Sequence, residues 1–440
     1  MDKRKLSRRS FLNLSAVTAA GAVLAACAPA TKTPEPGAEG PPKKIELSFW
    51  SDLVGSKEEG RAALIAAYNA ASDTVEVVHE GIFGQDEAHQ KFLTALAGGV
   101  MPDLYGNGAD LISGYVESNA LTDLGPYLEA SKALSAKDFP EGVLALCKYK
   151  DKIWGIPVYA DTMVLYYNKD LMAQAGYDPE SPPRDWDTLR QMAIKITKRD
   201  ASGTLEVAGC LWGNWSAPRV FVPNLYAYGG KLFNEDMTKV AFNSQEGYDA
   251  LRVIVDMIQK DKVTEVGWGE EFEDSVTEPF IAGKAGFQFD VPAATRRIVR
   301  WRPEFANWGI VGLPKGPAGF AQIAETIALM IPAKAQHKDA AWRFIEYWMQ
   351  PKVMVRWAQD IFRPPSTLSA LKDETLMADP RIAPVSEALL NTVETPQSPH
   401  WAEIFNAISA EIQLALIAQK TVEQALNDAA VTADRVLSLG

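Results

Sequence analysis

The sequence predicts an α/β protein with a mostly parallel sheet, and two observations lead to this fold class. Strand-like and helix-like segments alternate over residues 45–110 in the order strand, helix, strand, helix, strand. Parallel strands need a crossover connection, which is usually a helix. The chain also has 440 residues with 47% hydrophobic content, more than one hydrophobic core generally serves. We therefore expect two domains of this kind.

The alternating segment also predicts where a ligand site lies. Strands are expected at 45–49, 75–78 and 102–105, and helices begin at a capping box of Ser56 with Glu59 and near residue 88. Loops at 50–52 and 105–110 then follow the first and third strands. Ligands of parallel sheets bind beyond the carboxyl ends of the strands. Both loops are therefore expected at the ligand-binding edge.

A second unit is expected to begin near Trp154, and its later part is predicted to be rich in helices. Asp187 is expected to cap one of these helices. Apolar residues at helical spacing predict helices over 189–196, 248–258, 341–348 and 401–412. Trp401 falls on the apolar, core-facing stripe of the fourth of these. Thr421 with Gln424 opens the last helix.

The N-terminal segment predicts export. Residues 1–26 combine a basic start, an apolar run and small residues, which is the order of a signal peptide. Arg8-Arg9 followed by Phe-Leu resembles a twin-arginine signal, and Leu-Ala-Ala-Cys ending at Cys27 resembles a bacterial lipobox. The apolar run is too short to span a bilayer. We expect lipidation at Cys27, with residues 27–44 as a flexible, proline-rich linker.

Charge and cysteine content narrow the function. Without residues 1–26, 39 Lys and Arg face 55 Asp and Glu, a net charge of −16. Such an acidic chain is a poor candidate for binding nucleic acid. Cys147 and Cys210 then remain, and two buried free thiols are expected, with a disulfide as the alternative.

Several sequence segments resemble those of one protein family. They are Lys-Ile-Trp-Gly-Ile-Pro at 152–157, Leu-Tyr-Tyr-Asn-Lys-Asp-Leu at 165–171, Pro-Arg-Asp-Trp-Asp-Thr-Leu at 183–189, Phe-Ile-Ala-Gly-Lys-Ala-Gly-Phe at 280–287, the Gly-to-Pro stretch 309–317, and Lys-Asp-Ala-Ala-Trp-Arg-Phe at 338–344. Their order and spacing resemble the extracellular solute-binding proteins of bacterial ABC importers, specifically carbohydrate-binding family 1.

The resemblance implies a two-lobed periplasmic-binding-protein fold, with a mostly parallel, helix-flanked sheet in each lobe. Lobe one is expected at 45–157 plus 309–361, and lobe two at 158–308 plus 362–440. Hinge closure would trap a sugar or oligosaccharide for delivery to the permease subunits of an importer. The resemblance further implies an extracytoplasmic, lipid-anchored monomer, and no cofactor or metal is expected.

Two stretches depart from the family pattern. Residues 324–326 read Ala-Glu-Thr where many members carry paired glycines, and Asp290 is followed by Val-Pro-Ala instead of an apolar-aromatic continuation. Both stretches are expected to face the cleft. The sugar preference of better-studied members therefore does not transfer.

Aromatic residues in loops are the first group of candidate ligand contacts, because flat rings stack on the apolar faces of sugars. Trp212 and Trp215 flank Gly-Asn and are expected to expose their rings. Trp268, between two glycines, is a weaker candidate of the same kind. Core packing is the alternative for each.

Polar residues near strand ends form the second group of candidates. They are Asp52, Asn107, Asp110, Tyr159, Asp161, Asp290, Glu325 and Arg363. Turn formation is the alternative for Asp52, Asn107 and Asp110. Residues 296, 297 and 300 are arginines that we expect on a salt-bridged surface.

The enzyme hypothesis has less support. The chain has no Gly-x-Ser-x-Gly elbow, phosphate loop or His-Glu-x-x-His motif. A lipid-anchored glycosidase with two carboxylates remains an alternative. A second alternative keeps the fold but binds a glycerol phosphodiester, a polyamine or a metal. We expect a binding protein and no enzyme.

Overall fold

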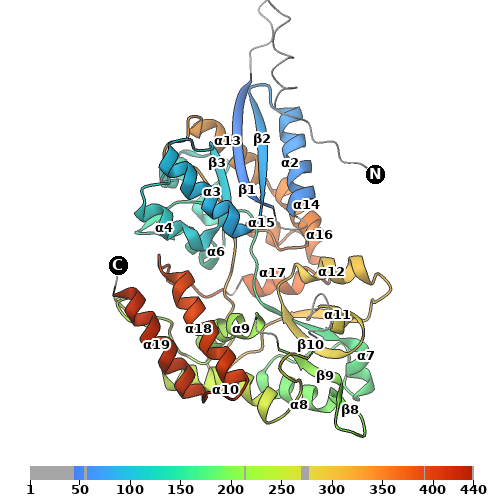
Figure 1. The fold of residues 1–440 in the computed structure, drawn as a ribbon. Coiled ribbons are helices and arrows are strands. Elements are labelled where there is room, and N and C mark those ends of the chain that lie inside the picture. The colour runs from blue at the N-terminus through green and yellow to red at the C-terminus, as the bar shows by residue number, and fades with distance from the viewer. Residues whose placement is uncertain (1–43, 54–56, 213–214, 269–276, 391, 439–440) are drawn as a thin grey trace, which may run out of the picture. The chain divides into compact units, whose positions relative to one another are not determined.

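The computed structural model describes residues 44–53, 57–212, 215–268, 277–390 and 392–438. Lys44–Gly440 form one compact unit. The predicted signal peptide, Cys27 and all of the linker but residue 44 lie outside the described residues, as does Ser56. Figure 1 shows that the unit contains two groups of strands, each surrounded by helices.

The first five-stranded sheet has the order β2-β1-β3-β12-β6. Its strands are β1 (Ile45–Leu53), β2 (Val75–Phe83), β3 (Leu104–Gly108), β12 (Ile327–Met330) and β6 (Ile156–Pro157). β1 runs parallel to β2 and β3, whereas β12 is antiparallel to β3 and β6.

Helices cover both faces of this sheet. Its helices are α2 (Lys57–Ala71), α3 (Gln85–Gly98), α4 (Ile112–Glu117), α5 (Gly125–Ala130), α6 (Glu141–Ala145), α13 (Lys338–Trp348) and α14 (Pro351–Ile361), with 3₁₀ turns η1 (Ala109–Leu111) and η2 (Ala136–Asp138) and the small hairpin β4 (Lys148–Tyr149) and β5 (Lys152–Ile153). On one face, Phe49 packs with α13 and α14 through rings such as Phe344 and Trp357. On the other, Tyr105 packs with Phe92 and Tyr115.

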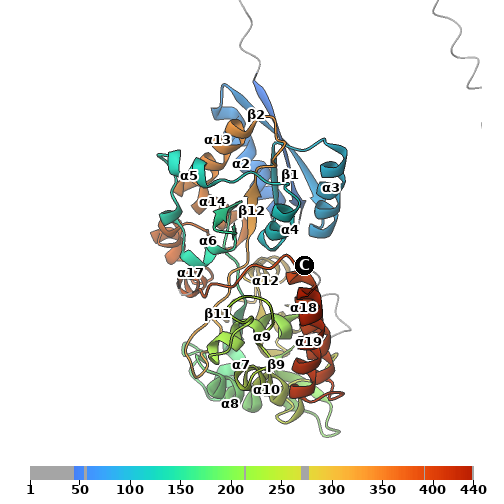
Figure 2. The same cartoon turned by 90° about the vertical axis from the view of Figure 1, so that its left-hand side faces the viewer.

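The second five-stranded sheet has the order β11-β7-β10-β9-β8. Its strands are β11 (Trp308–Gly312), β7 (Val164–Asn168), β10 (Ala285–Asp290), β9 (Leu205–Leu211) and β8 (Lys198–Arg199). Its helices are α7 (Lys169–Gln174), α8 (Trp186–Ile196), α9 (Ser216–Ala227), α10 (Gln245–Gln259), α11 (Thr277–Ile281), α12 (Ala294–Trp301), α18 (Trp401–Leu416) and α19 (Val422–Leu437). Figure 2 shows α18 and α19 side by side along this lobe.

The α/β class and the two-lobed architecture are confirmed, but both sheets are mixed and not mostly parallel. Among the described strands of the second sheet, only β9 and β10 pair in parallel, while β7 is antiparallel to β10 and β11. The strands that return from the other lobe explain this. β12 reaches the first sheet after crossing from β11, so it needs no crossover helix and runs against β3.

The lobe boundaries stay a prediction, although two segments lie elsewhere than expected. β11 pairs with β7 in the second sheet, whereas residues from 309 onward were assigned to lobe one. Conversely, Ala370 of α15 (Leu368–Leu371) is buried in the core of the first sheet. Leu376 of α16 (Glu374–Met377) packs with Ala358. α17 (Ala383–Leu389) packs against β11.

Several local predictions need correction. β1 continues through Leu53 and β3 through Gly108, so residues 50–52 and 106–108 lie in strands and not in open loops. The cap of α8 is Asp185, whose side chain accepts a hydrogen bond from the Thr188 amide, and not Asp187. The capping box of Thr421 and Gln424 at α19 is confirmed.

Two further expectations concern single residues and membrane segments. Cys147 and Cys210 are buried free thiols, as expected. Within the described part of the chain, no helix combines the length and apolar character that a membrane span requires.

Candidate functional site

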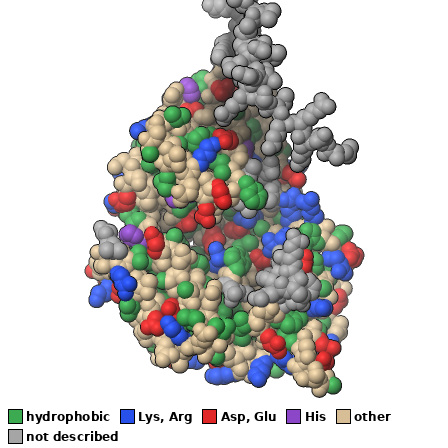
Figure 3. Space-filling view, viewed as in Figure 1, with side chains coloured by type: hydrophobic (Ala, Val, Ile, Leu, Met, Phe, Trp, Pro, Cys, Tyr) green, Lys and Arg blue, Asp and Glu red, His purple; other side chains and the backbone are tan. Residues whose placement is uncertain are grey.

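A cavity of about 740 Å³ lies where the two lobes face each other. This volume is within the range of small-molecule sites, roughly 300–1,000 Å³. Its walls come from the ends of β1 and η1 in the first lobe, from α9 and α18 in the second, and from the segments that connect the lobes. In Figure 3 acidic side chains gather around the hollow between the two halves.

The connecting segments are bonded to one another at the back of this cavity. The backbones of Asp161 and Glu325 exchange two hydrogen bonds of 2.7 Å each. The Ala160 amide donates to the Pro364 carbonyl at 3.0 Å, which adds the third segment. Loop residues and element ends of this kind, located between two cores, are where the hinges of two-lobed proteins lie, and we call this set of segments the hinge.

A buried ion pair reinforces this hinge. Arg363 Nη1 lies 2.6 Å from Asp161 Oδ2, and the two side chains are 13% and 4% exposed. The Arg363 guanidinium also lies 4.7 Å from the ring centre of Tyr159. Burial raises the pKa of Tyr159, and the cation of Arg363 opposes this rise only in part.

Asp52 shows how a polar side chain is accommodated in a buried strand. It is 1% exposed at the end of β1. Arg61 of α2 donates to the Asp52 carbonyl at 2.7 Å and lies 3.6 Å from its carboxylate. The neighbouring His79 contacts Ser51 at 2.8 Å, and burial together with Arg61 lowers the pKa of His79 to about 4.

Asp110 lies in the 3₁₀ turn after β3, and its exposed side chain lines the cavity. The surrounding walls of the cleft raise the pKa of this carboxyl by desolvation. Asn107, three residues earlier, is fully buried and donates a hydrogen bond of 2.7 Å to the Tyr105 hydroxyl. Asn107 therefore shapes the end of β3 beneath the cavity.

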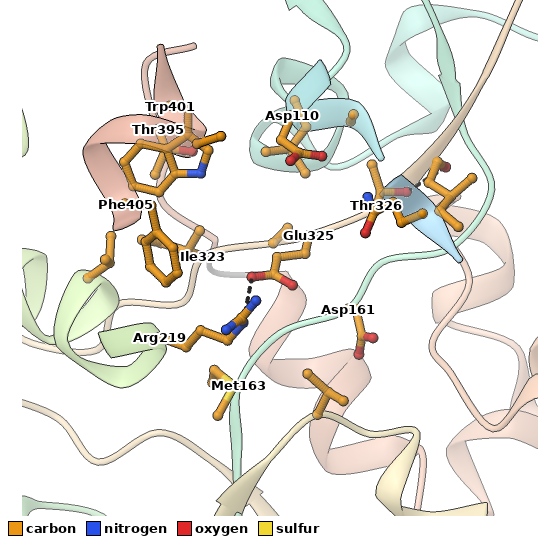
Figure 4. Close-up of a pocket in the computed structure, with 18 of the residues that line it drawn as sticks. Asp110, Asp161, Met163, Arg219, Ile323, Glu325, Thr326, Thr395, Trp401 and Phe405 are labelled. Atoms are coloured by element: carbon orange, nitrogen blue, oxygen red, sulfur yellow. Dashed lines mark hydrogen bonds and ion pairs between the residues drawn. The ribbon is translucent and has the colours of Figure 1, made fainter. Parts of the chain in front are cut away.

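Aromatic side chains of the second lobe line one side of the cavity. Figure 4 shows Trp401 and Phe405, one turn apart on α18, next to Arg219 of α9. The Trp401 and Phe405 ring centres lie 5.5 Å apart, and both residues are only partly buried. Trp215 is 41% exposed at the start of α9 and lines the same cavity.

Seven of the eleven predicted site residues line this cavity. They are Asp52, Asp110, Tyr159, Asp161, Trp215, Glu325 and Arg363. Their contact with a ligand stays a prediction.

The other four predicted residues lie away from the cavity lining, and their packing explains why. Trp212 is 7% exposed and packs in a cluster of three rings, with its centre 4.5 Å from that of Phe289 and 6.2 Å from that of Trp186. Trp268 donates from its indole to the Leu205 carbonyl at 3.2 Å. Asp290, at the end of β10, is paired with Arg297 at 2.6 Å. Asn107 is the fourth.

Sequence reasoning missed Arg219, Trp401 and Phe405. Trp401 was assigned to the core face of the helix predicted at 401–412, which also contains Phe405. Helical spacing alone does not show that the apolar face of this helix extends beyond the core. Arg219 lies five residues after the predicted Gly-Asn loop, within a helix, where an arginine is usually solvated. Of the predicted surface arginines, Arg296 pairs with Glu59 at 3.0 Å.

The arrangement is suited to a polyhydroxylated ligand. Exposed rings offer flat apolar faces, while carboxylates and guanidiniums offer strong acceptors and donors. Among the residues that the structure describes, no cluster of His, Cys, Asp and Glu could hold a metal ion.

Comparison with known proteins agrees with this geometry. The model of the family described as "Bacterial extracellular solute-binding protein" matches residues 63–384. The maltodextrin-binding protein MdxE of Bacillus subtilis is 22% identical over 367 residues, covering 81% of this chain and 82% of its own. An uncharacterized lipoprotein from the oleD 5′ region of Streptomyces antibioticus is 28% identical over 376 residues, with 80% and 76% covered.

A solved structure shares the fold over the same extent. The sugar-binding protein MalE of Xanthomonas citri superimposes with a TM-score of 0.80 and 25% identity, covering 90% of this chain and 98% of its own.

Proposed function

Since the chain belongs to the bacterial extracellular solute-binding proteins, we propose that it captures a sugar or oligosaccharide by hinge closure and delivers it to the permease of an ABC importer. The observation that supports this most is the cavity between the lobes. It is lined both by the partly exposed rings of Trp215, Trp401 and Phe405 and by carboxylates, and hydrogen-bonded connecting segments join the two lobes there. MdxE and MalE, named for maltodextrin and sugar binding, provide independent support.

We further propose that the protein works outside the cytoplasm as a lipid-anchored monomer. The support is the lipobox-like sequence at Cys27, after a twin-arginine-like Arg8-Arg9, and the relative that is named a lipoprotein. The proline-rich stretch that follows would let the lobes reach a permease. Metabolic labelling with a fatty acid, lost in Cys27→Ser, tests the anchor.

The sugar proposal is tested by measuring melting temperature and tryptophan fluorescence with a panel of mono- and oligosaccharides. A ligand that binds only the folded state at 100 times its Kd stabilises it by about 2.7 kcal/mol. We expect a rise in melting temperature and a saturable fluorescence change for at least one sugar. A panel that produces neither would remove the sugar from the proposal.

The same incubations separate binding from catalysis. A non-catalytic receptor leaves every oligosaccharide intact, so chromatography after overnight incubation should return the starting sugar. Shorter products would instead favour the glycosidase alternative. Glycerol phosphodiesters and polyamines belong in the panel as the non-sugar alternatives. sn-Glycerol 3-phosphate is added because one relative is the sn-glycerol-3-phosphate-binding protein UgpB of Pectobacterium atrosepticum, 24% identical over 425 residues.

A further inference from the structure

Arg219 occupies a fixed position in the middle of the cavity wall. Its guanidinium lies 4.6 Å from the ring centre of Trp215 and 5.3 Å from that of Phe405. Cation–π contacts with two rings restrict the long side chain, which is 30% exposed toward the cavity. The sequence positions these three side chains from two helices, α9 and α18.

The hydrogen-bonding capacity of this arginine is largely unused. Its Nε lies 4.0 Å from Glu325 Oε1, which is an ion pair but is too long for a hydrogen bond. Among the described residues, none accepts a hydrogen bond from the guanidinium. Arg61 and Arg363, by contrast, reach oxygen atoms at 2.7 and 2.6 Å. Arg219 thus holds five N–H donors in place with no hydrogen-bond acceptor in the part of the chain that the structure describes.

Glu325 is a weak partner for it. The Glu325 side chain is 57% exposed to the cavity, yet the walls of the cleft surround it, and desolvation raises its pKa. Arg219 opposes this rise only in part, and the nearby carboxylates of Asp161 and Asp110 add to it by repelling the Glu325 charge. The pair can therefore be broken at small cost by a ligand that places acceptors within hydrogen-bond distance of the guanidinium.

The charge of the cavity narrows what that ligand can be. Five carboxylates line the cavity, against the two guanidiniums of Arg219 and Arg363. A carboxylate or phosphate ligand would meet this excess of negative charge. Adjacent hydroxyl groups carry no charge and can accept two N–H bonds from one planar guanidinium.

We propose that Arg219 is a specificity-determining residue of the cleft, exchanging Glu325 for two adjacent hydroxyl groups of a neutral sugar. Trp215 and Phe405 keep the guanidinium in place during the exchange. The inference rests on the proposed function. It identifies Arg219 as the residue of the second lobe that selects a sugar by the positions of its hydroxyl groups. It also assigns Glu325 the role of a competitor that the ligand displaces.

The experiment compares Kd values by calorimetry for the neutral sugar that gives the largest melting shift in the panel. The variants are Arg219→Lys, Arg219→Gln and Glu325→Gln, with Arg252→Gln as the control. Arg252 is a half-buried arginine of α10 that pairs with Asp249 and Glu423, away from the cavity. The melting temperature of each ligand-free variant reports whether it is folded.

Arg219→Gln and Arg219→Lys should each raise Kd at least tenfold, because lysine keeps the charge but not the planar pair of donors. Glu325→Gln should lower Kd several-fold, since the competitor loses its charge, and Arg252→Gln should leave Kd unchanged. Opposite effects at Arg219 and Glu325 cannot arise from a merely structural pair, whose loss would weaken binding from either side.

Three results overturn the inference. They are an unchanged Kd in Arg219→Gln, a Kd raised in Glu325→Gln as in Arg219→Gln, and tighter binding of the matching uronic acid than of the neutral sugar. Each leaves the proposed function intact, because the wild type still binds its sugar. If the wild type binds no sugar of the panel, the proposed function fails first and this inference falls with it.

Discussion

Replacing Arg363 with Met removes the cation that faces a buried carboxylate at the hinge. The Asp161 side chain is 4% exposed and lies 2.6 Å from Arg363. Breaking a buried pair from one side costs about 3–5 kcal/mol, because the remaining charge stays in a poorly solvated place. The lost contact with the Tyr159 ring adds roughly 0.5–1 kcal/mol. Since Arg363 is 13% exposed, we expect the lower end, a loss of about 3 kcal/mol in the free energy of unfolding.

Urea denaturation at pH 7, followed by circular dichroism and by tryptophan fluorescence, measures this loss. The matched control is Arg356→Met, because Arg356 also pairs with an aspartate, Asp360 at 2.9 Å, but is 75% exposed. An exposed pair of this kind contributes at most about 0.5 kcal/mol. Adding Asp161→Asn to Arg363→Met should restore most of the stability, because neither charge of this pair then remains.

A loss below about 1 kcal/mol in Arg363→Met would refute this reasoning, since a buried ion pair and an exposed ion pair would then contribute similarly to the free energy of unfolding. Failure of Asp161→Asn to restore stability would show that the cost lies in lost packing and not in charge.

The remaining predictions concern five other residues. Trp212→Ala should cost about 3–5 kcal/mol in urea denaturation as a core truncation, and a ligand-binding defect without this loss would contradict its place in the core. Trp401→Ala should instead lower sugar affinity while leaving the urea midpoint of the ligand-free protein nearly unchanged. Cys147 and Cys210 should react with a thiol reagent only after unfolding, because burial raises the pKa of both thiols; reaction in the native protein would refute this. His79 is held neutral by a pKa of about 4, below the value of 6.5 in an unfolded chain. As pH falls, the unfolded state therefore binds a proton before the folded state does. The free energy of unfolding should decline from its value above pH 6.5 by about 2 kcal/mol toward pH 4, once the partial exposure of His79 is discounted. The His79→Gln variant should lose less free energy of unfolding than the wild type between pH 7 and pH 4.5.

Local patterns predicted much of the fold because they depend on neighbours in the chain. Helical spacing located α10, α13 and α18, and the side chain of Thr421 caps α19 as its spacing to Gln424 predicted. The alternation of strands and helices gave the α/β class. Strand direction was predicted less well, because β12 reaches its sheet from the other lobe, which no local pattern records.

The errors at the site share a physical cause, which is tertiary contact. Asp52 was assigned to the loop after the first strand, but it lies in that strand. A buried carboxylate is costly there, and Arg61, nine residues later, compensates this cost. Trp212 was expected to be exposed, yet Phe289 and Trp186 form a stack with it. Trp401 was assigned to the core because helical spacing does not tell where the core ends.

One measurement tests the central claim most directly, namely calorimetric titration of the wild-type protein and of Trp401→Ala with the sugar selected by the panel. If the cavity between the lobes is a sugar site, the wild type should bind one sugar per chain with a saturable heat. Trp401→Ala should then bind at least tenfold more weakly, since stacking of an aromatic ring beyond its area is worth about 0.5–1.5 kcal/mol and the buried apolar area adds to this. Equal affinities in the two proteins, or a wild type that binds no sugar, would contradict it.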